Sequence, residues 1–136
     1  MYELEMNGQM VKFNFGMGFL REINKTVTVP VDGMKDMKQN VGLRYTVGRL
    51  NDYDVEALVE VLFMANKGCD PRITMDELDA FINDENTDID EVFEKTLGFL
   101  KKANATKNAT LDALNAIEKE KAKREAMEKM RMESMM

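Results

Sequence analysis

The sequence has no histidine and no tryptophan, and only one of its 136 residues is cysteine. Without histidine, the chain lacks the side chain that most often acts as a catalytic base, a proton shuttle or a metal ligand. One cysteine and no histidine exclude a Cys/His nucleophile and an ordinary zinc site. Cys69 cannot form a disulfide within the chain, which fits a reducing cytosol. We therefore expect a binding or assembly protein without a cofactor, not an enzyme.

Long apolar runs are also missing. No stretch approaches the ~18 to 20 apolar residues that a membrane-spanning helix needs. The first ten residues, MYELEMNGQM, lack the basic region followed by an apolar region that marks a signal peptide. We therefore expect neither membrane insertion nor secretion.

The acidic residues resemble a calcium loop only in part. Asp84, Asn86 and Asp88 stand at the first, third and fifth positions of such a loop. The sixth position is Ile89 where glycine is required, and the twelfth is Lys95 where a bidentate glutamate is required. Acidic helix N-termini explain these residues better, so we expect no metal site.

Charge is distributed unevenly along the chain. Residues 1–100 carry 19 acidic and 10 basic side chains, whereas residues 101–136 carry 6 acidic and 9 basic ones. An acidic body argues against nucleic-acid binding, because phosphate contacts need a basic face. The mildly basic tail alternates in sign, which is typical of a solvated helix.

The most apolar continuous run is Tyr53–Lys67, YDVEALVEVLFMANK. A helix that is apolar on most of its circumference has to be buried on most of it. Asn51, Asp52 or Asp54 can cap its start, and Gly68 can end it. We predict that this segment is the central helix around which the other elements pack.

The N-terminus predicts a β-hairpin. Asn7-Gly8 is a strong signal for a two-residue turn, because both central residues of a type I′ turn need a positive φ. With this turn, apolar pairs share one face of the ribbon: Tyr2 with Phe13, and Leu4 with Val11. Two strands alone are marginally stable in water, so this face must pack on a helix or pair further.

Four more helices are predicted around the central one. They cover Phe15–Lys25, Val41–Leu50, a segment opened by the capping box Thr74–Glu77, and a segment from Asp88 to about Ala103. Val41–Leu50 also alternates like a strand; we favour a helix because a short break at Asn51-Asp52 would then join two antiparallel helices.

The segment between the first two of these helices is harder to interpret. Thr26–Val31 alternates with a period of two, and Pro30 would confine such a strand to an edge or a loop. Asp32-Gly33 is a predicted turn, and Met34–Asn40 is polar with no clear pattern.

Two sets of residues are candidates for protein contacts. A strand edge with little charge near Met10 makes the hairpin a candidate self-association surface, formed by Leu4, Met10, Val11 and Phe13.

Thirteen methionines favour an adaptable apolar surface. Beyond a possible hinge at 104–110, the predicted partner-binding residues lie on a charged helix: Leu111, Leu114, Ile117, Met127 and Met130. Their partner is either a neighbouring copy or another protein.

The predicted fold is therefore α+β and predominantly α-helical. The N-terminal hairpin packs on a bundle of about five helices, and an extended C-terminal helix follows. We expect a domain over 1–107 and a charged, methionine-rich helical extension over 108–136, loosely tied to the body because its charge pairs stabilise a lone helix only slightly.

Three stretches resemble a known family. The hairpin followed by FNFGMGFLREINK, the run TVTVPVDGMKDMKQNVGLRYTVGRLNDYDVEALVEVLFMANKG and the run DIDEVFEKTLGFLKKANATK are similar to tail assembly chaperones of long-tailed phages and prophages of Gram-positive bacteria. The resemblance covers roughly residues 1–107 and implies no catalytic residues.

The resemblance implies a role in the host cytoplasm. Such proteins bind the tape-measure protein, keep it soluble, and leave as the tail tube polymerises, so they are absent from the mature virion. The resemblance also implies an open homo-oligomer of many copies along one tape measure. In many phages a frameshifted longer form recruits the major tail tube protein, and this chain resembles the short form. The alternatives are a structural or adaptor protein of the virion, of the head–tail connector type, and a regulatory binding module.

Overall fold

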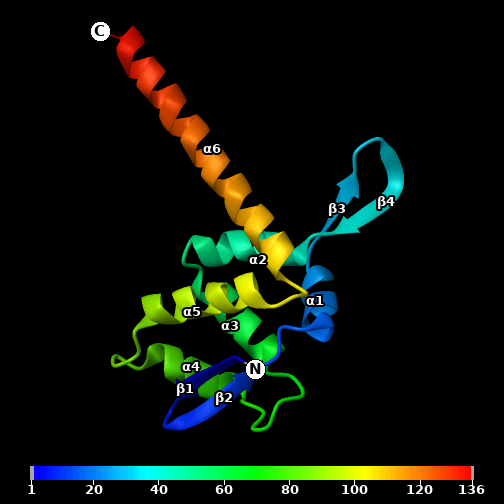
Figure 1. The fold of residues 1–136 in the computed structure, drawn as a ribbon, viewed down its shortest axis with the longest axis vertical. Coiled ribbons are helices and arrows are strands. Elements are labelled where there is room, and N and C mark those ends of the chain that lie inside the picture. Colours follow the sequence, from blue (N-terminus) through cyan, green and yellow to red (C-terminus); the bar gives the residue numbers. More distant parts are fainter. Residues whose placement is uncertain (1, 136) are drawn as a thin grey trace.

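The computed structural model describes residues 2–135 and is an α+β fold dominated by helices, as predicted (Figure 1). Helices α1 to α5 form the body with an N-terminal hairpin, while a second hairpin and the long helix α6 project from it (Figure 1). The elements in chain order are β1 (Tyr2–Met6), β2 (Gln9–Phe13), α1 (Met17–Asn24), β3 (Thr28–Val31), β4 (Met34–Asn40), α2 (Gly42–Asn51), α3 (Val55–Ala65), α4 (Met75–Asn83), α5 (Ile89–Lys102) and α6 (Lys107–Ser134).

Helix α3 is the central helix, as its composition predicts. Among the three candidate caps, Asp54 is the residue whose carboxylate accepts hydrogen bonds from the backbone N–H groups of Glu56 and Ala57. The helix packs against α1, α2, α4 and α5. Its buried residues are Ala57, Leu58, Val61, Leu62 and Ala65. Burial on several sides follows from its nearly continuous apolar circumference.

The N-terminal hairpin has the predicted turn and register. Asn7 and Gly8 have φ angles of 51° and 81°, and Leu4 pairs with Val11. The apolar face of the ribbon lies in the core that it shares with the helices. The backbone N–H of Asn14, directly after β2, donates to the carbonyl of Ala65 at 2.8 Å, which ties the hairpin to the end of α3.

Asn66 joins three segments and was not singled out by the sequence. Its side chain is fully buried, and its Nδ2 donates to the carbonyls of Lys12 at 2.9 Å and Pro71 at 3.1 Å. Its Oδ1 accepts from the backbone N–H of Ile73 at 2.8 Å and from Arg72. The single amide therefore satisfies buried backbone groups of β2 and of the loop that follows α3.

Helix α2 resolves the ambiguity of Val41–Leu50 in favour of a helix. Leu43, Val47 and Leu50 are buried at helical spacing, whereas Tyr45 is 56% exposed. The helix begins at Gly42, where an added Cβ would lie 1.7 Å from the carbonyl oxygen of Ile23. Only glycine fits at this crossing of α1 and α2.

The structure contains a second hairpin that the sequence predicts only in part. Thr28–Val31 is a strand, as its alternation suggests, and it pairs with the polar strand β4 across the predicted Asp32-Gly33 turn. Val29, Met34 and Met37 are exposed, and the hairpin stands away from the body (Figure 1). Since the described side chains of these two strands supply no buried face, the hydrophobic pattern of β4 gives little signal.

Helices α4 and α5 begin at the predicted caps. Thr74 and Glu77 form a complete capping box, and the Asp88 side chain accepts from the backbone N–H of Glu91. Asp84 accepts from the backbone N–H of Asn86 in the connecting turn. These acidic side chains therefore serve the ends and turns of the helices.

Helix α6 is continuous from Lys107, so the expected hinge is confined to the turn before it. Thr110 and Ala113 are buried, Leu114 packs against the core, and this part of the helix contacts α2 and α5. The first turns of the segment 108–136 thus pack on the body. From Glu118 onward the helix is exposed and extends away from the body (Figure 1).

Candidate functional site

The structure separates the predicted self-association residues. Leu4, Val11 and Phe13 are at most 5% exposed and lie in the core of their own chain, whereas Met10 is 50% exposed. The apolar face of the hairpin packs on its own helices, because a two-stranded ribbon needs such a partner to be stable. These three side chains are therefore not open to a second copy, and the hairpin offers Met10 and its strand edges.

The predicted partner-binding residues fall into two groups along α6. Leu111 is 45% exposed, Leu114 and Ile117 are half-buried at the base of the helix, and Met127 and Met130 are each 70% exposed. The two groups are separated by ten residues from Ile117 to Met127, which is roughly 15 Å of helix. One small ligand cannot contact both groups, whereas an extended protein surface can.

A cleft of about 650 Å³ lies where α6 leaves α2. Tyr45 of α2 and Ala116 and Ile117 of α6 give it an apolar lining. At its rim, Arg44 Nη2 lies 3.4 Å from Asp112 Oδ2, and this ion pair links the two helices. The sequence gives no signal that Tyr45 lines a cleft, because the residues of α6 that form the other wall are about 70 positions away.

A second groove, of about 630 Å³, is lined by aromatic and small side chains. Tyr2, Phe15 and Met17 line it together with Ala103 and Ala105 of the turn before α6. The aromatic rings are held by one another: Phe15 and Phe19 have ring centroids 5.0 Å apart, edge to face. This arrangement presents a preformed apolar surface beside the N-terminal hairpin.

A third groove, of about 380 Å³, lies between α3 and α4. Its apolar lining consists of Val55, Val59 and Ile82. Its carboxylates are Glu56, Glu60 and Asp79. The sequence contained a signal for one wall, because Val55 with Val59, and Glu56 with Glu60, recur one helical turn apart.

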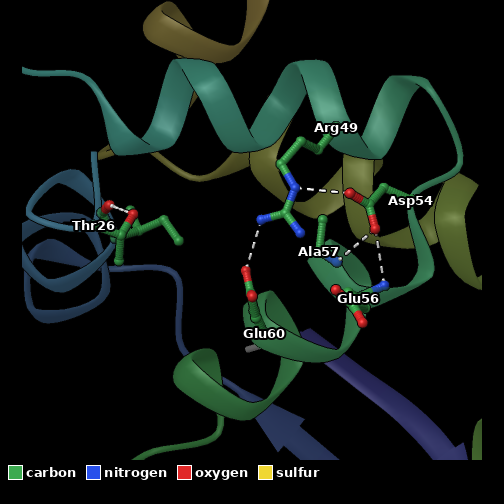
Figure 2. Close-up of polar contacts among 7 residues, drawn as sticks. Thr26, Arg49, Asp54, Glu56, Ala57 and Glu60 are labelled. Atoms are coloured by element: carbon green, nitrogen blue, oxygen red, sulfur yellow. Dashed lines mark hydrogen bonds and ion pairs between the residues drawn. The ribbon is translucent and has the colours of Figure 1, made fainter. Parts of the chain in front are cut away.

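Arg49 fixes the position of the α3 wall of this groove (Figure 2). Its Nε lies 2.8 Å from Asp54 Oδ2, and its Nη1 lies 2.8 Å from Glu60 Oε2. The hydrogen bond from Arg49 lowers the pKa of the Asp54 carboxyl, and the same bond raises the pKa of Arg49. One guanidinium thus joins the end of α2 to both the cap and the second turn of α3.

Across residues 2–135, His, Cys, Asp and Glu side chains do not form a cluster of three that could hold a metal ion. The helices in the same range do not combine the length and apolarity that a membrane crossing requires. The described residues form grooves between helices and a projecting helix, which are the kinds of surface on which helices and extended segments dock in protein complexes.

A family model described as phage tail assembly chaperone protein, TAC, matches residues 3–115. This chain belongs to that family. The match to the tail assembly chaperones runs from the hairpin to the turns of α6 that pack on the body, so it ends close to the point where α6 becomes exposed. Comparisons with curated proteins and with solved structures returned no match. Membership of a chaperone family favours a non-enzymatic role in tail assembly.

Proposed function

We propose that this tail assembly chaperone binds the tape-measure protein in the cytoplasm of a bacterial host and keeps it soluble. It leaves as the tail tube polymerises. The main support for this proposal is the family match over residues 3–115, which spans the body of the structure. The apolar grooves on that body supply the surface that an apolar helical client needs.

We place the tape-measure contact at the cleft between α2 and α6. Tyr45 and Ile117 line this cleft, and Leu111 lies exposed on the same helix. An amphipathic helix buries residues at steps of three and four in such a groove, and aromatic side chains are common anchors at protein interfaces. The neighbouring Arg44–Asp112 pair would remain at the polar rim.

Co-expression with the tape-measure protein tests this proposal. The full chain should raise the soluble fraction of the tape measure and co-purify with it. Tyr45→Asp with Ile117→Asp should lower both, because a carboxylate in the cleft opposes apolar contact. Val29→Asp with Met37→Asp is the matched control, since it makes the same chemical change on the projecting hairpin β3–β4. A tape measure that stays insoluble with the wild-type chain would overturn the proposal.

The alternative role is a structural protein of the virion. Mass spectrometry of purified particles separates the two roles, because a chaperone that leaves during polymerisation is absent from them. In infected cells, an immunoblot with an antibody against residues 1–107 should also reveal a longer product if frameshifting adds a domain that recruits the major tail tube protein.

A further inference from the structure

The groove between α3 and α4 combines an apolar floor with an acidic rim. Val55 is exposed at the floor, and Val59 and Ile82 are half-buried beside it. Arg49 pairs with Glu60 (Figure 2), whereas Glu56 and Asp79 form no ion pair with the side chains that the structure describes. A ligand for this groove therefore needs apolar side chains flanked by positive charge.

The outer part of α6, residues 118–134, has such a face. Residues three or four positions apart lie on the same side of a helix, so positions 119, 123, 127 and 130 share one side, and position 131 lies at its edge. These positions carry cations around two methionines and form what we name the α6 basic face: Lys119, Lys123, Met127, Met130 and Arg131. Glu118 and Glu125 lie on the opposite side of the helix. Glu120 lies within the basic face, but Arg124 beside it is 4.0 Å away and compensates its charge, so the face keeps a net positive charge.

We propose that the α6 basic face of one copy docks into the α3–α4 groove of a neighbouring copy. Met127 and Met130 would lie on Val55, Val59 and Ile82, while the lysines face Glu56 and Asp79. Methionine suits this position because its flexible side chain adapts to an irregular apolar floor. Opposite charge at the rim fixes the partner and the orientation.

The geometry makes the contact intermolecular. The outer end of α6 lies at the far end of the molecule from α4, so a rigid α6 cannot reach the groove of its own chain (Figure 1). Residues 118–134 span roughly 25 Å, which exceeds the length of about 16 Å of the α3 helix, so the helix can cover the groove. Because the helix and the groove are different surfaces, the contact is head-to-tail and generates a ring or an open array.

This inference rests on the proposed function only for its biological setting, which is many copies along one tape measure. The contact itself is a property of the isolated chain. It is therefore tested without the tape-measure protein, by sedimentation velocity of the full chain over a series of concentrations and salt conditions. Added salt should weaken self-association, since it screens the charge pairs at the rim.

Charge reversal provides the decisive arms of the experiment. Lys119→Glu with Lys123→Glu should weaken self-association about tenfold or more, and so should Glu56→Lys with Asp79→Lys, because each places like charges opposite one another. Mixing these two variants should restore association, since each tail then faces a groove of opposite sign. The same rescue is expected when all four substitutions are combined in one chain.

The matched controls make the same charge changes elsewhere. Lys121→Glu with Lys129→Glu acts on the other side of α6, and Asp90→Lys with Glu94→Lys acts on α5; both should leave self-association unchanged. Circular dichroism of every variant confirms that it is folded. A monomeric wild-type chain at all concentrations, equal effects of the controls, or a mixture that does not associate would each overturn the docking.

The two proposals can fail separately. If the chain associates and the reversal pattern holds, but the tape measure remains insoluble, only the proposed function is wrong. If the tape measure is solubilised while charge reversal leaves association unchanged, only the docking is wrong.

Discussion

Helices α3 and α6 illustrate two opposite uses of a helix in one chain. Helix α3 has 11 residues, five of which are buried, and it lies among the other helices of the body. Helix α6 has 28 residues, of which only Thr110 and Ala113 are buried within its described length. The short helix holds the fold together, and most of the long helix is available for partners. Length therefore says little about how much a helix contributes to stability.

The largest expected effect is in the short helix. Leu62→Ala should lower the free energy of unfolding by about 2 to 5 kcal/mol, because it leaves a cavity at a fully buried position. Met127→Ala is the comparison on α6, where a 70% exposed side chain and similar helix propensities predict almost no change. Chemical denaturation of both variants measures the difference, and equal effects would contradict the division between the two helices.

Asn66→Ala should have the next largest effect. It removes the partner of several buried backbone groups, and leaving such groups unsatisfied costs roughly 2 to 4 kcal/mol in total. Asn83→Ala is a suitable control, because Asn83 is an exposed residue at the end of α4. A denaturation midpoint that is unchanged in Asn66→Ala would show that water or another group replaces the amide.

Truncation at two points would place the boundary within α6. A chain that ends after Ala109 loses Thr110, Ala113 and Leu114, and should be destabilised by about 2 kcal/mol through lost apolar burial. A chain that ends after Asn115 keeps these residues and should be much closer to the full chain. Equal stability of the two truncated chains would instead place the boundary at residue 107, as the sequence suggested.

The smallest expected effect concerns the pH dependence at the cap of α3. Arg49 lowers the pKa of Asp54 in the folded state, so this pair stabilises the fold above the ordinary carboxyl pKa of 3.8. The contribution is lost as the pH falls through the lower folded-state pKa. Asp54→Asn keeps a capping oxygen but removes the charge. The stability difference between wild type and variant should therefore shrink on acidification below pH 3.8, and a constant difference would exclude the ion pair as its source.

Much of the fold could be predicted because local signals agree with the packing. Asn7-Gly8 sets the hairpin register, Thr74 and Asp88 cap their helices, and the apolar circumference of α3 requires burial. The strand β4 could not be predicted, because its described side chains are exposed and its sequence has no periodic apolar pattern.

The candidate surfaces were only partly predictable. The apolar residues of the hairpin were correctly identified as one face, but the pattern cannot show whether that face meets its own helices or another chain. The grooves depend on pairs distant in sequence, such as Tyr45 with Ile117 and Val59 with Ile82, which join only after the helices pack. Sequence periodicity assigns a residue to a face but does not identify the element opposite it.

Truncation after Ile117 separates the two parts of the molecule, because it removes the projecting part of α6 and leaves the packed part intact. We predict a melting temperature within about 2 °C of the full chain. We also predict that self-association is lost in sedimentation experiments on the same sample. A truncated chain that unfolds, or one that associates as strongly as the full chain, would contradict the division between a stable body and a helix exposed for partners.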